Sequence, residues 1–234
     1  MRVSDELPPV RLIGEACVPT NRTTDDELTD LRAAELITHR NFTELVEVFD
    51  GPTTRGCLVV STADDPQRLP LGPTEFAKFR LYRRLHNYLA SVYSLNEQVR
   101  FLVNSALGDP EAVDSPLGRG SFVPNDATTY TRKLAFVRGL RIDFQHGDFR
   151  SVELELVPDP DPNLAGETED VYRVVFDKQT FRSGFVDDPD KYLKHYPDRR
   201  FRHVVSYLDS FHEEVHQFAA GTREWLAGDD DPFQ

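Results

Sequence analysis

The sequence predicts a mainly α protein, an antiparallel helical bundle with a small β-hairpin attached, and three features of the chain support this. Residues 74–107 carry apolar side chains with a helical period of about 3.6 residues, and residues 199–226 repeat this pattern. Residues 151–157 and 171–177 alternate apolar and polar side chains, as paired strands do, with an acidic, proline-rich insert between them. Two long amphipathic helices and one long-looped hairpin therefore form the framework of the expected fold.

The first third of the chain, residues 1–73, is predicted to be an irregular strap followed by one helix that packs on the bundle. Residues 1–23 are dotted with proline and show no regular pattern. Thr24 then precedes the acidic run DDE, which is typical of an N-cap followed by a first helical turn with favourable charge. Residues 55–62 fit either a short strand or an extended connector.

Residues 74–228 are predicted to form the bundle itself, within what is expected to be a single domain overall. After the long helix comes a loop rich in Gly, Pro and Asp, and a second helix then spans about residues 128–146 before Gly147 ends it. The hairpin lies within residues 150–178, and a short helix and a proline-bounded connector follow it. A short acidic tail, residues 229–234, closes the chain.

The composition is that of a folded, strongly acidic protein. Of 234 residues, 39% are hydrophobic, and the formal net charge of −13 arises from 40 acidic against 27 basic residues. Only five of the basic residues are Lys and 24 of the acidic residues are Asp, a balance that resembles proteins of salt-in halophilic archaea, where an acidic surface serves solubility. The acidity therefore does not exclude a nucleic-acid partner, but such binding would rest on local arginines, hydrogen bonds and stacking.

Nothing in the sequence indicates secretion or membrane insertion. The start MRVSDELPPVRL lacks the apolar core of a signal peptide, and no apolar run approaches the length of a membrane span. The two cysteines, Cys17 and Cys57, have neither metal-ligand spacing nor the pattern of a disulfide framework. We therefore expect a cytoplasmic protein without a membrane partner.

The segment KLAFVRGLRIDFQHGDF, residues 133–149, places Arg141 and His146 in an R-x-x-x-x-H spacing. Val137 and Phe144 lie one turn either side of Arg141, so the guanidinium emerges in line with an apolar stripe. A charge in that position is costly unless a partner compensates for it. The sequence leaves open whether this partner is a bound phosphate or a carboxylate of the protein in a buried salt bridge.

Together with the preceding helix, this motif resembles a known family. The stretch FRLYRRLHNYLASVYSLNEQVRFLV followed by FVRGLRIDFQH is similar to HEPN-like proteins, in particular to uncharacterised prokaryotic members whose motif helix reads like LRNYxQH, over roughly residues 75–227. The resemblance implies a four-helix bundle that often dimerises and brings two R-x-x-x-x-H motifs to one cleft. Active members are metal-independent ribonucleases, and inactive ones bind nucleotides or act as scaffolds, frequently in toxin–antitoxin and antiviral systems.

Applied to this chain, the resemblance implies that Arg141 holds the scissile phosphate and that His146 moves protons during attack by the ribose 2′-hydroxyl. It implies a homodimer that needs no cofactor, with RNA or a nucleotide and an antitoxin-like protein as partners. One position departs from the family, because Ile142 follows the arginine where a polar residue is usual. Asp143 stands about 100° further round the helix and is available to pair with Arg138 or Arg141. The departure leaves open whether the chain cleaves its ligand or only binds it.

A basic patch on the long helix supplies further candidate phosphate-binding residues, in addition to Arg138. The patch consists of Arg80, Arg83 and Arg84, with His86 and Asn87. Its functional interpretation is a wall of phosphate contacts that faces Arg141 across the bundle. The alternative is a solvated helix face whose arginines pair with nearby acids.

A competing motif lies on the last helix. His212, Glu213 and His216 form H-E-x-x-H, the spacing that in zinc peptidases places two imidazoles on one helix face with a carboxylate beside the metal-bound water. Only 18 of the 234 residues follow His216, which leaves no room for a second ligand-bearing helix. A third ligand would have to come from upstream, such as His195 or His203, and the alternative is an acidic, histidine-bearing helix edge without metal.

Three functions therefore stay open at the level of sequence. The first is a HEPN-like protein that binds or cleaves RNA or a nucleotide through Arg141 and His146. The second is a non-catalytic scaffold that binds a partner protein. The third is a zinc hydrolase that uses the H-E-x-x-H motif.

Overall fold

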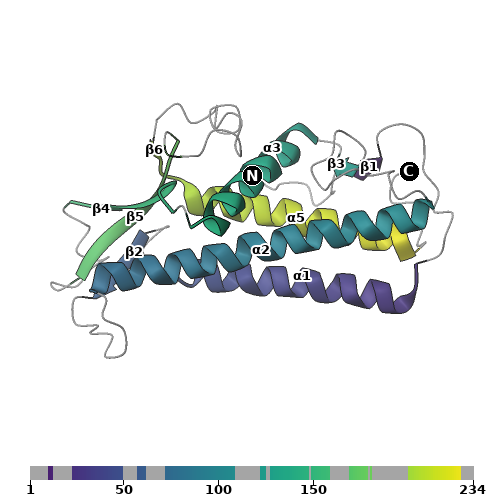
Figure 1. Cartoon of the computed structure of the whole chain (residues 1–234), viewed down its shortest axis with the longest axis horizontal. Helices are drawn as coiled ribbons and strands as arrows, with labels where there is room; N and C mark the ends of the chain where they lie inside the picture. Colours follow the sequence, from purple (N-terminus) through teal and green to yellow (C-terminus); the bar gives the residue numbers. More distant parts are fainter. Residues whose placement is uncertain are drawn as a thin grey trace, which may run out of the picture. The chain divides into compact units, whose positions relative to one another are not determined.

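The computed structural model describes residues 10–12, 23–49, 57–61, 72–108, 122–124, 127–147, 149–158, 169–178, 180 and 200–227. Among these residues the protein is mainly helical, which confirms the mainly α part of the predicted fold class. The helices are α1 (Asp25–Val46), α2 (Pro73–Leu107), α3 (Ala127–Gln145) and α5 (Val204–Ala227), labelled in Figure 1. The strands are β1 (Val10–Leu12), β2 (Cys57–Ser61), β3 (Phe122–Pro124), β4 (Val152–Leu156), β5 (Glu169–Asp177) and β6 (Arg200–Phe201).

The chain divides into two compact units. The first unit contains residues 1–39, 91–135 and 211–234, and the second unit contains residues 40–90 and 136–210. The division passes through all four described helices, so each unit combines a part of every helix with a sheet of its own. In the first unit, β1 and β3 form a two-stranded antiparallel sheet. The arrangement of the helices as one antiparallel bundle stays a prediction.

Local capping contacts explain where the helices begin and end. At the start of α1, the Thr24 N–H donates to the Glu27 carboxylate at 2.9 Å, and the Glu27 N–H donates to the Thr24 hydroxyl at 3.3 Å. The bond from the Thr24 N–H, together with one from the Thr24 hydroxyl to the same carboxylate at 2.8 Å, stabilises the charged form and lowers the pKa of Glu27. At the start of α2, the Gly72 N–H donates to the Glu75 carboxylate at 3.1 Å. Gly147, with φ of +70°, ends α3. The predicted N-cap at Thr24 and the predicted stop at Gly147 are both confirmed.

The predicted hairpin is present in the second unit, and the structure adds two strands to it. β4 and β5 pair antiparallel, with Val152 opposite Phe176. β2 pairs with the other edge of β5 over Cys57–Ser61, so this segment is a strand and not a connector. β6 also pairs with β5, which gives a four-stranded sheet. In Figure 1 these strands lie near the N-terminal end of α2, where the hydroxyls of Thr74 and Tyr172 are 3.1 Å apart.

The last helix begins later than the sequence pattern predicts. Its expected start was residue 199, but β6 occupies Arg200–Phe201 and α5 begins at Val204. The predicted short helix and connector after the hairpin lie outside the described residues, as does the predicted acidic tail. The prediction was therefore wrong for the first turn of this helix and holds for the rest.

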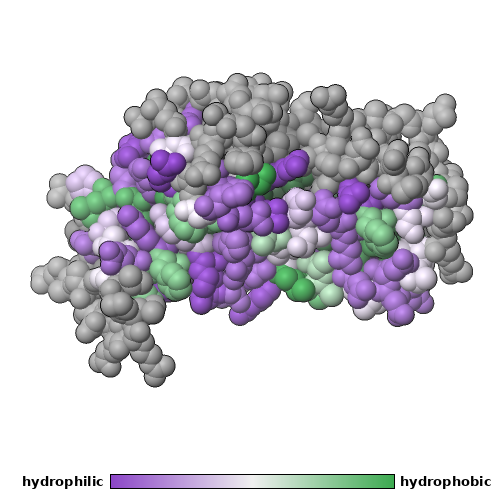
Figure 2. All heavy atoms as spheres, viewed as in Figure 1, coloured by the Kyte–Doolittle hydropathy of each residue, from purple (hydrophilic) through white to green (hydrophobic). Residues whose placement is uncertain are grey.

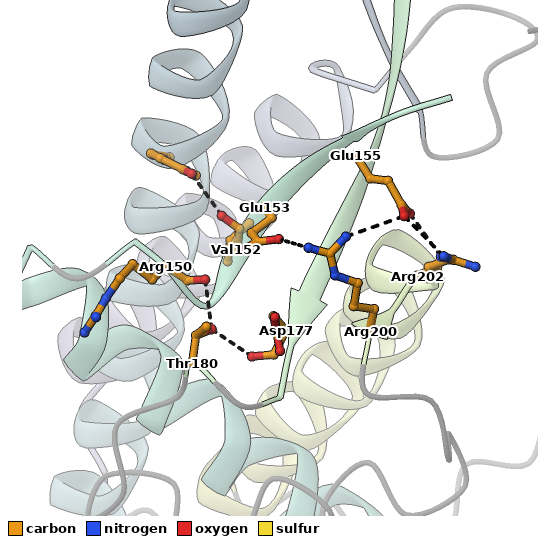
Figure 3. Close-up of polar contacts among 9 residues, drawn as sticks. Arg150, Val152, Glu153, Glu155, Asp177, Thr180, Arg200 and Arg202 are labelled. Atoms are coloured by element: carbon orange, nitrogen blue, oxygen red, sulfur yellow. Dashed lines mark hydrogen bonds and ion pairs between the residues drawn. The ribbon is translucent and has the colours of Figure 1, made fainter. Parts of the chain in front are cut away.

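Ion pairs between side chains spaced two residues apart explain this extended segment. Arg200 donates to Glu153 at 2.6 Å and lies 3.6 Å from Glu155, and Arg202 donates to Glu155 at 3.0 Å (Figure 3). Side chains two residues apart point to the same face of an extended chain. In a helix the two arginines would lie about 200° apart and could not both reach β4. Contacts with β4 therefore override the apolar helical stripe in this segment.

Each unit has an apolar core of its own. In the second unit, the Phe136 ring from α3 meets the Phe176 ring of β5 edge-on at 5.3 Å, and the buried leucines of α2 complete this core. In the first unit, the buried apolar residues come from all four described helices and include Leu31, Leu95, Val99, Leu102, Leu134, Phe211, Val215, Phe218 and Trp225. These residues recur every three or four positions along their helices, as the period of the sequence predicts.

Polar side chains cover most of the described surface that is visible in Figure 2, in keeping with the net charge of −13. Among the described residues, the large apolar side chains that stay exposed are Leu36, Ile37, Phe79, Phe101 and Leu156. None of the helices in the described ranges combines the length and the apolar character that crossing a membrane requires.

Candidate phosphate-binding groove and histidine cluster

The residues of the R-x-x-x-x-H motif lie on the second half of α3, in the second unit. Arg138 and His146 are exposed, and Arg141 is half-buried. His146 closes the last turn of the helix, because its backbone N–H donates to the carbonyl of Ile142 at 3.1 Å. His146 follows Arg141 by five positions, which puts their side chains about 140° apart around the helix axis. A single copy of α3 therefore presents the guanidinium and the imidazole to different sides.

Asp143 is directed toward the interior of the second unit. It is 1% exposed, whereas Arg138, one and a half turns earlier, is exposed to solvent. A buried carboxylate requires polar partners in the protein, since burial of a charge is costly without them. Asp143 therefore belongs to the structural framework behind the motif and is not presented to a ligand in solution.

A groove open to solvent lies at the C-terminal end of α3, within the second unit. Its volume is about 570 Å³. The lining residues are Lys78 and Tyr82 from α2, Gly147, Phe149 and Arg150 from the turn after α3, and Val152 and Glu153 from β4. Lys78 and Arg150 contribute two positive charges against the one negative charge of Glu153. Gly147 directly follows His146, so the chain that carries the exposed imidazole also forms the wall of the groove.

Aromatic side chains form one side of this groove. The Tyr82 and Phe149 rings are stacked, with their centres 4.9 Å apart. The Phe144 ring lies edge-on to both, with its centre 5.9 Å from that of Tyr82 and 5.0 Å from that of Phe149. The Tyr82 hydroxyl donates to the carbonyl of Val152 at 2.9 Å, and burial, with a smaller effect of Glu153, raises the pKa of Tyr82. Tyr82 therefore stays neutral and ties α2 to β4 at the groove.

Arg150 is held in place through its backbone. The Thr180 hydroxyl donates to the Arg150 carbonyl at 2.8 Å, a contact drawn in Figure 3. The same figure shows the Arg150 side chain extending away from the Glu153–Arg200 ion pair. Thr180 thus anchors the main chain of the turn after α3, and Arg150 lines the groove.

The basic patch predicted on α2 is not brought to this groove. Tyr82 faces the groove, and the patch residues Arg80, Arg83, Arg84 and Asn87 lie about 100–160° from it around the helix. Arg84 forms an ion pair with Glu44 of α1. The Arg83 guanidinium lies 6.0 Å from the ring centre of Phe79. The Asn87 carbonyl accepts from the Asn41 side chain at 3.5 Å. Arg84 therefore fits the alternative interpretation, a solvated helix face whose arginines pair with nearby acids, because its partner is Glu44 of α1.

The H-E-x-x-H motif lies on α5 in the first unit, where the structure adds a third histidine. His212 is 7% exposed, whereas Glu213 and His216 are exposed. His39 of α1 lies with its Nδ1 atom 3.2 Å from Nε2 of His212, and the His39 and His216 ring centres are 6.4 Å apart. Burial first, and then repulsion by the other two histidines, lower the pKa of His212 to about 4.

The upstream ligand that a zinc site would need was sought at His195 or His203. His195 lies outside the described residues, and His203 belongs to the second unit. Across the described ranges, no three His, Cys, Asp or Glu side chains form a group that could hold a metal ion. The residue that does reach the motif is His39, which sequence reasoning missed because nothing near it in the chain marks it.

Sequence reasoning also missed the groove residues Lys78, Phe149, Arg150 and Glu153. The available signal was the position of Phe149 and Arg150 directly after the helix stop at Gly147, next to the motif histidine.

No family model matches the chain, and neither the curated proteins nor the solved structures contain a match to it. The likeness to HEPN proteins therefore stays a prediction.

Proposed function

We propose that this chain is a HEPN-like protein that binds RNA or a nucleotide, with the groove at the end of α3 as the binding surface. The observation that carries the proposal is that a groove with two cations and an aromatic wall adjoins the histidine of the predicted motif. Its volume of about 570 Å³ lies in the range typical of small-molecule sites.

The groove offers separate partners for the two parts of a nucleotide. Lys78 and Arg150 suit the phosphate, since an ammonium and a guanidinium are the side chains that most often bind phosphate oxygens. Tyr82 and Phe149 suit a base, because every base has a face that stacks on an aromatic ring. The C-terminal end of a helix repels anions, so binding of a phosphate beside the end of α3 depends on these two cations.

Cleavage makes a further demand on the geometry. Arg141 and His146 would have to act on one phosphate, and on a single α3 they lie about 140° apart. A homodimer would meet this geometric requirement, because Arg141 of one copy and His146 of the other can then approach the same phosphate. Arg141 would stabilise the charge that develops on the phosphate, and His146 would transfer the proton of the 2′-hydroxyl.

The test measures binding and cleavage of a labelled single-stranded RNA separately, without added metal, at low and at molar KCl. Lys78→Ala and Arg150→Ala should each weaken binding about tenfold or more. Arg202→Ala is the matched control, since it removes one exposed positive charge of the second unit that already pairs with Glu155. Equal effects of all three variants, or no binding by the wild type, contradict the proposal.

Cleavage is read from the ends of the products. Wild-type protein that leaves 2′,3′-cyclic phosphate ends, with loss of cleavage in both Arg141→Ala and His146→Ala, establishes a metal-independent ribonuclease. RNA that is bound but stays intact restricts the function to binding. Cleavage that is unchanged in both variants rules out Arg141 and His146 as the reactive pair.

A second candidate function, partner binding without catalysis, is favoured by exposed apolar side chains in the first unit. Leu36 and Ile37 of α1 are 53% and 57% exposed, and Phe101 of α2 is 63% exposed. Contiguous exposed apolar surface often marks interaction sites, and Leu36 and Ile37 are neighbours in the chain. Light scattering on the wild type and on Ile37→Glu and Phe101→Glu tests this function. A dimer that becomes a monomer in the variants supports self-association, and a monomeric wild type leaves an antitoxin-like protein as the partner to seek.

A further inference from the structure

Glu153 is an acidic residue in a groove that otherwise suits an anion, and the binding of a phosphate gives it no role. Its side chain is 36% exposed, and it lines the groove together with Lys78, Tyr82 and Arg150. A carboxylate accepts hydrogen bonds and cannot donate them, and an ionised phosphate has no donor to offer it. Glu153 is therefore matched to a part of the ligand that carries N–H or O–H groups.

Arg200 holds this carboxylate and offsets its charge. The Arg200 guanidinium donates to Oε2 of Glu153 at 2.6 Å, a contact drawn in Figure 3. Among the described residues, none donates a hydrogen bond to the other oxygen, Oε1. The positive charge of Arg200 reduces the repulsion between Glu153 and a phosphate bound elsewhere in the groove. A carboxylate has about four acceptor sites, so this ion pair leaves Glu153 able to accept from a ligand.

The carboxylate lies apart from the guanidinium that suits the phosphate. Arg150 precedes β4 and Glu153 belongs to it, and their side chains extend in different directions in Figure 3. Burial first, and then the charge of Glu153, raise the pKa of Tyr82, so the carboxylate is within electrostatic reach of the aromatic wall. The pairing edge of a base is the part of a nucleotide farthest from its phosphate. With the phosphate on Arg150 and the base on the aromatic wall, this edge faces Glu153.

The four RNA bases differ in the donors on their pairing edges. Guanine carries two donors side by side, the N1–H and the N2 amino group, and these match the two oxygens of a carboxylate. In adenine and cytosine the amino group adjoins an unprotonated ring nitrogen, an acceptor that a carboxylate repels. In uracil the N–H lies between two carbonyl oxygens. A carboxylate on the pairing edge therefore favours guanine.

We propose that the groove selects guanine, and that Glu153 determines this specificity by accepting from the N1–H and the N2 amino group of the base. The inference rests on the proposed nucleotide-binding function and adds the class of ligand. That ligand is a guanosine phosphate unit, either a free nucleotide or a residue of single-stranded RNA. Lys78 and Arg150 hold its phosphate, and Glu153 reads its base.

The test is calorimetric titration of the full chain with GMP, IMP, AMP, CMP and UMP, without added metal. The wild type should bind GMP about tenfold or more tighter than AMP, with IMP, which lacks the N2 amino group, between them. The nucleotide 2′-deoxy-GMP should bind like GMP, because the 2′-hydroxyl makes no contact with Glu153. Oligouridine with and without one central guanosine separates the two sources. A preference in both assays assigns the site to RNA, and a preference for GMP alone assigns it to the free nucleotide.

Two variants of β4 form a matched pair. Glu153→Gln keeps the size of the side chain and should bring the affinities for GMP and AMP within about twofold of each other. Glu155→Gln is the control and should keep the guanine preference. It neutralises the next carboxylate on the same face of β4, which also lies near Arg200 but is not among the residues that line the groove.

The outcomes separate this inference from the function on which it rests. Equal binding of all five nucleotides, weakened in Lys78→Ala and Arg150→Ala, overturns the guanine assignment and leaves the proposed function standing. A guanine preference that persists in Glu153→Gln also overturns the assignment, as does an equal loss in Glu155→Gln. Weak binding of 2′-deoxy-GMP assigns Glu153 to the ribose instead of the base. Absence of binding by every nucleotide and by RNA overturns both proposals.

Discussion

The Nδ1 atom of His39 lies 3.2 Å from Nε2 of His212, although the two residues are 173 positions apart in the chain. A second contact between the same helices joins Glu35 to Arg223. Moving back along α1 therefore corresponds to moving forward along α5, so these two helix segments run antiparallel within the first unit. Both contacts are polar and directional, so each can form in only one register of α1 against α5.

The pKa of His212 predicts that stability falls in mild acid. The unfolded chain takes up a proton near pH 6.5, whereas the folded chain does so only near pH 4. Well above pH 6.5 His212 is neutral in both states, so this difference has no effect on the free energy of unfolding. As the pH falls below 6.5, the unfolded state binds a proton that the folded state does not bind. The free energy of unfolding therefore decreases. Between pH 7 and pH 5 the loss is about 2 kcal/mol.

Urea unfolding of the wild type and of His212→Gln across this pH range checks the effect. The variant keeps a polar side chain and cannot titrate. Between pH 7 and pH 5 its free energy of unfolding should therefore fall by about 2 kcal/mol less than that of the wild type. Carboxylates that titrate in the same range affect both proteins equally and cancel in the comparison. Parallel curves for the two proteins would show that His212 titrates normally in the folded state.

Glu35 should be sensitive to the loss of Arg223 and much less to the loss of Arg32. Its carboxylate is buried, and it pairs with Arg223, which is 27% exposed, and with Arg32, which is 48% exposed. Removing the more buried partner leaves a buried charge incompletely compensated, so Arg223→Ala should lower stability by about 2 kcal/mol. Arg32→Ala should cost less than about 1 kcal/mol. Urea midpoints at constant slope measure both, and equal losses would contradict the assignment.

The sequence was sufficient for the elements whose signal is local. Thr24 with its acidic first turn, the apolar period of α2 and the glycine after α3 each lie within the segment they define. In these segments the local helix propensity and the tertiary packing favour the same structure. The predicted and observed ends of the helices therefore differ by about one residue, as is usual for helix ends. Alternation of side chains likewise revealed β4 and β5, although their burial does not follow it, since Val174, Val175 and Phe176 of β5 are consecutive and all buried.

The sequence was insufficient where a partner lies far along the chain. β2 and β6 become strands because β5 offers them an edge, and nothing in their own short stretches specifies that edge. The groove combines α2, the turn after α3 and β4, so its lining cannot be read from any one segment. His39 shows the same limit, because a lone histidine on an amphipathic helix carries no mark of the histidines it will meet.

Ion pairs across the four-stranded sheet should contribute little to stability, and this contribution should vanish at high salt concentration. Arg200→Ala and Arg202→Ala remove half-exposed partners of Glu153 and Glu155, and each should lower stability by under about 1 kcal/mol at low salt. In molar KCl the differences should vanish, because the Debye length shortens to about 3 Å. Val175→Ala in the buried part of β5 is the contrast, with a loss of about 2 kcal/mol at any salt concentration. Salt-independent losses in the arginine variants would show that these residues act through packing.

Gly147 should be required for its backbone conformation and not for the space it leaves. Its φ is +70°, and a Cβ built on it would meet no atom within 4 Å. Gly147→Ala should therefore lower stability by about 1–2 kcal/mol through left-handed strain alone, and Gly147→Asn by less, because asparagine adopts this conformation more readily. Urea unfolding measures both losses, and RNA affinity in the same variants reports on the groove wall that Gly147 forms beside His146. If alanine and asparagine cost the same, the positive φ is not the reason for glycine here, and the end of α3 tolerates a different turn.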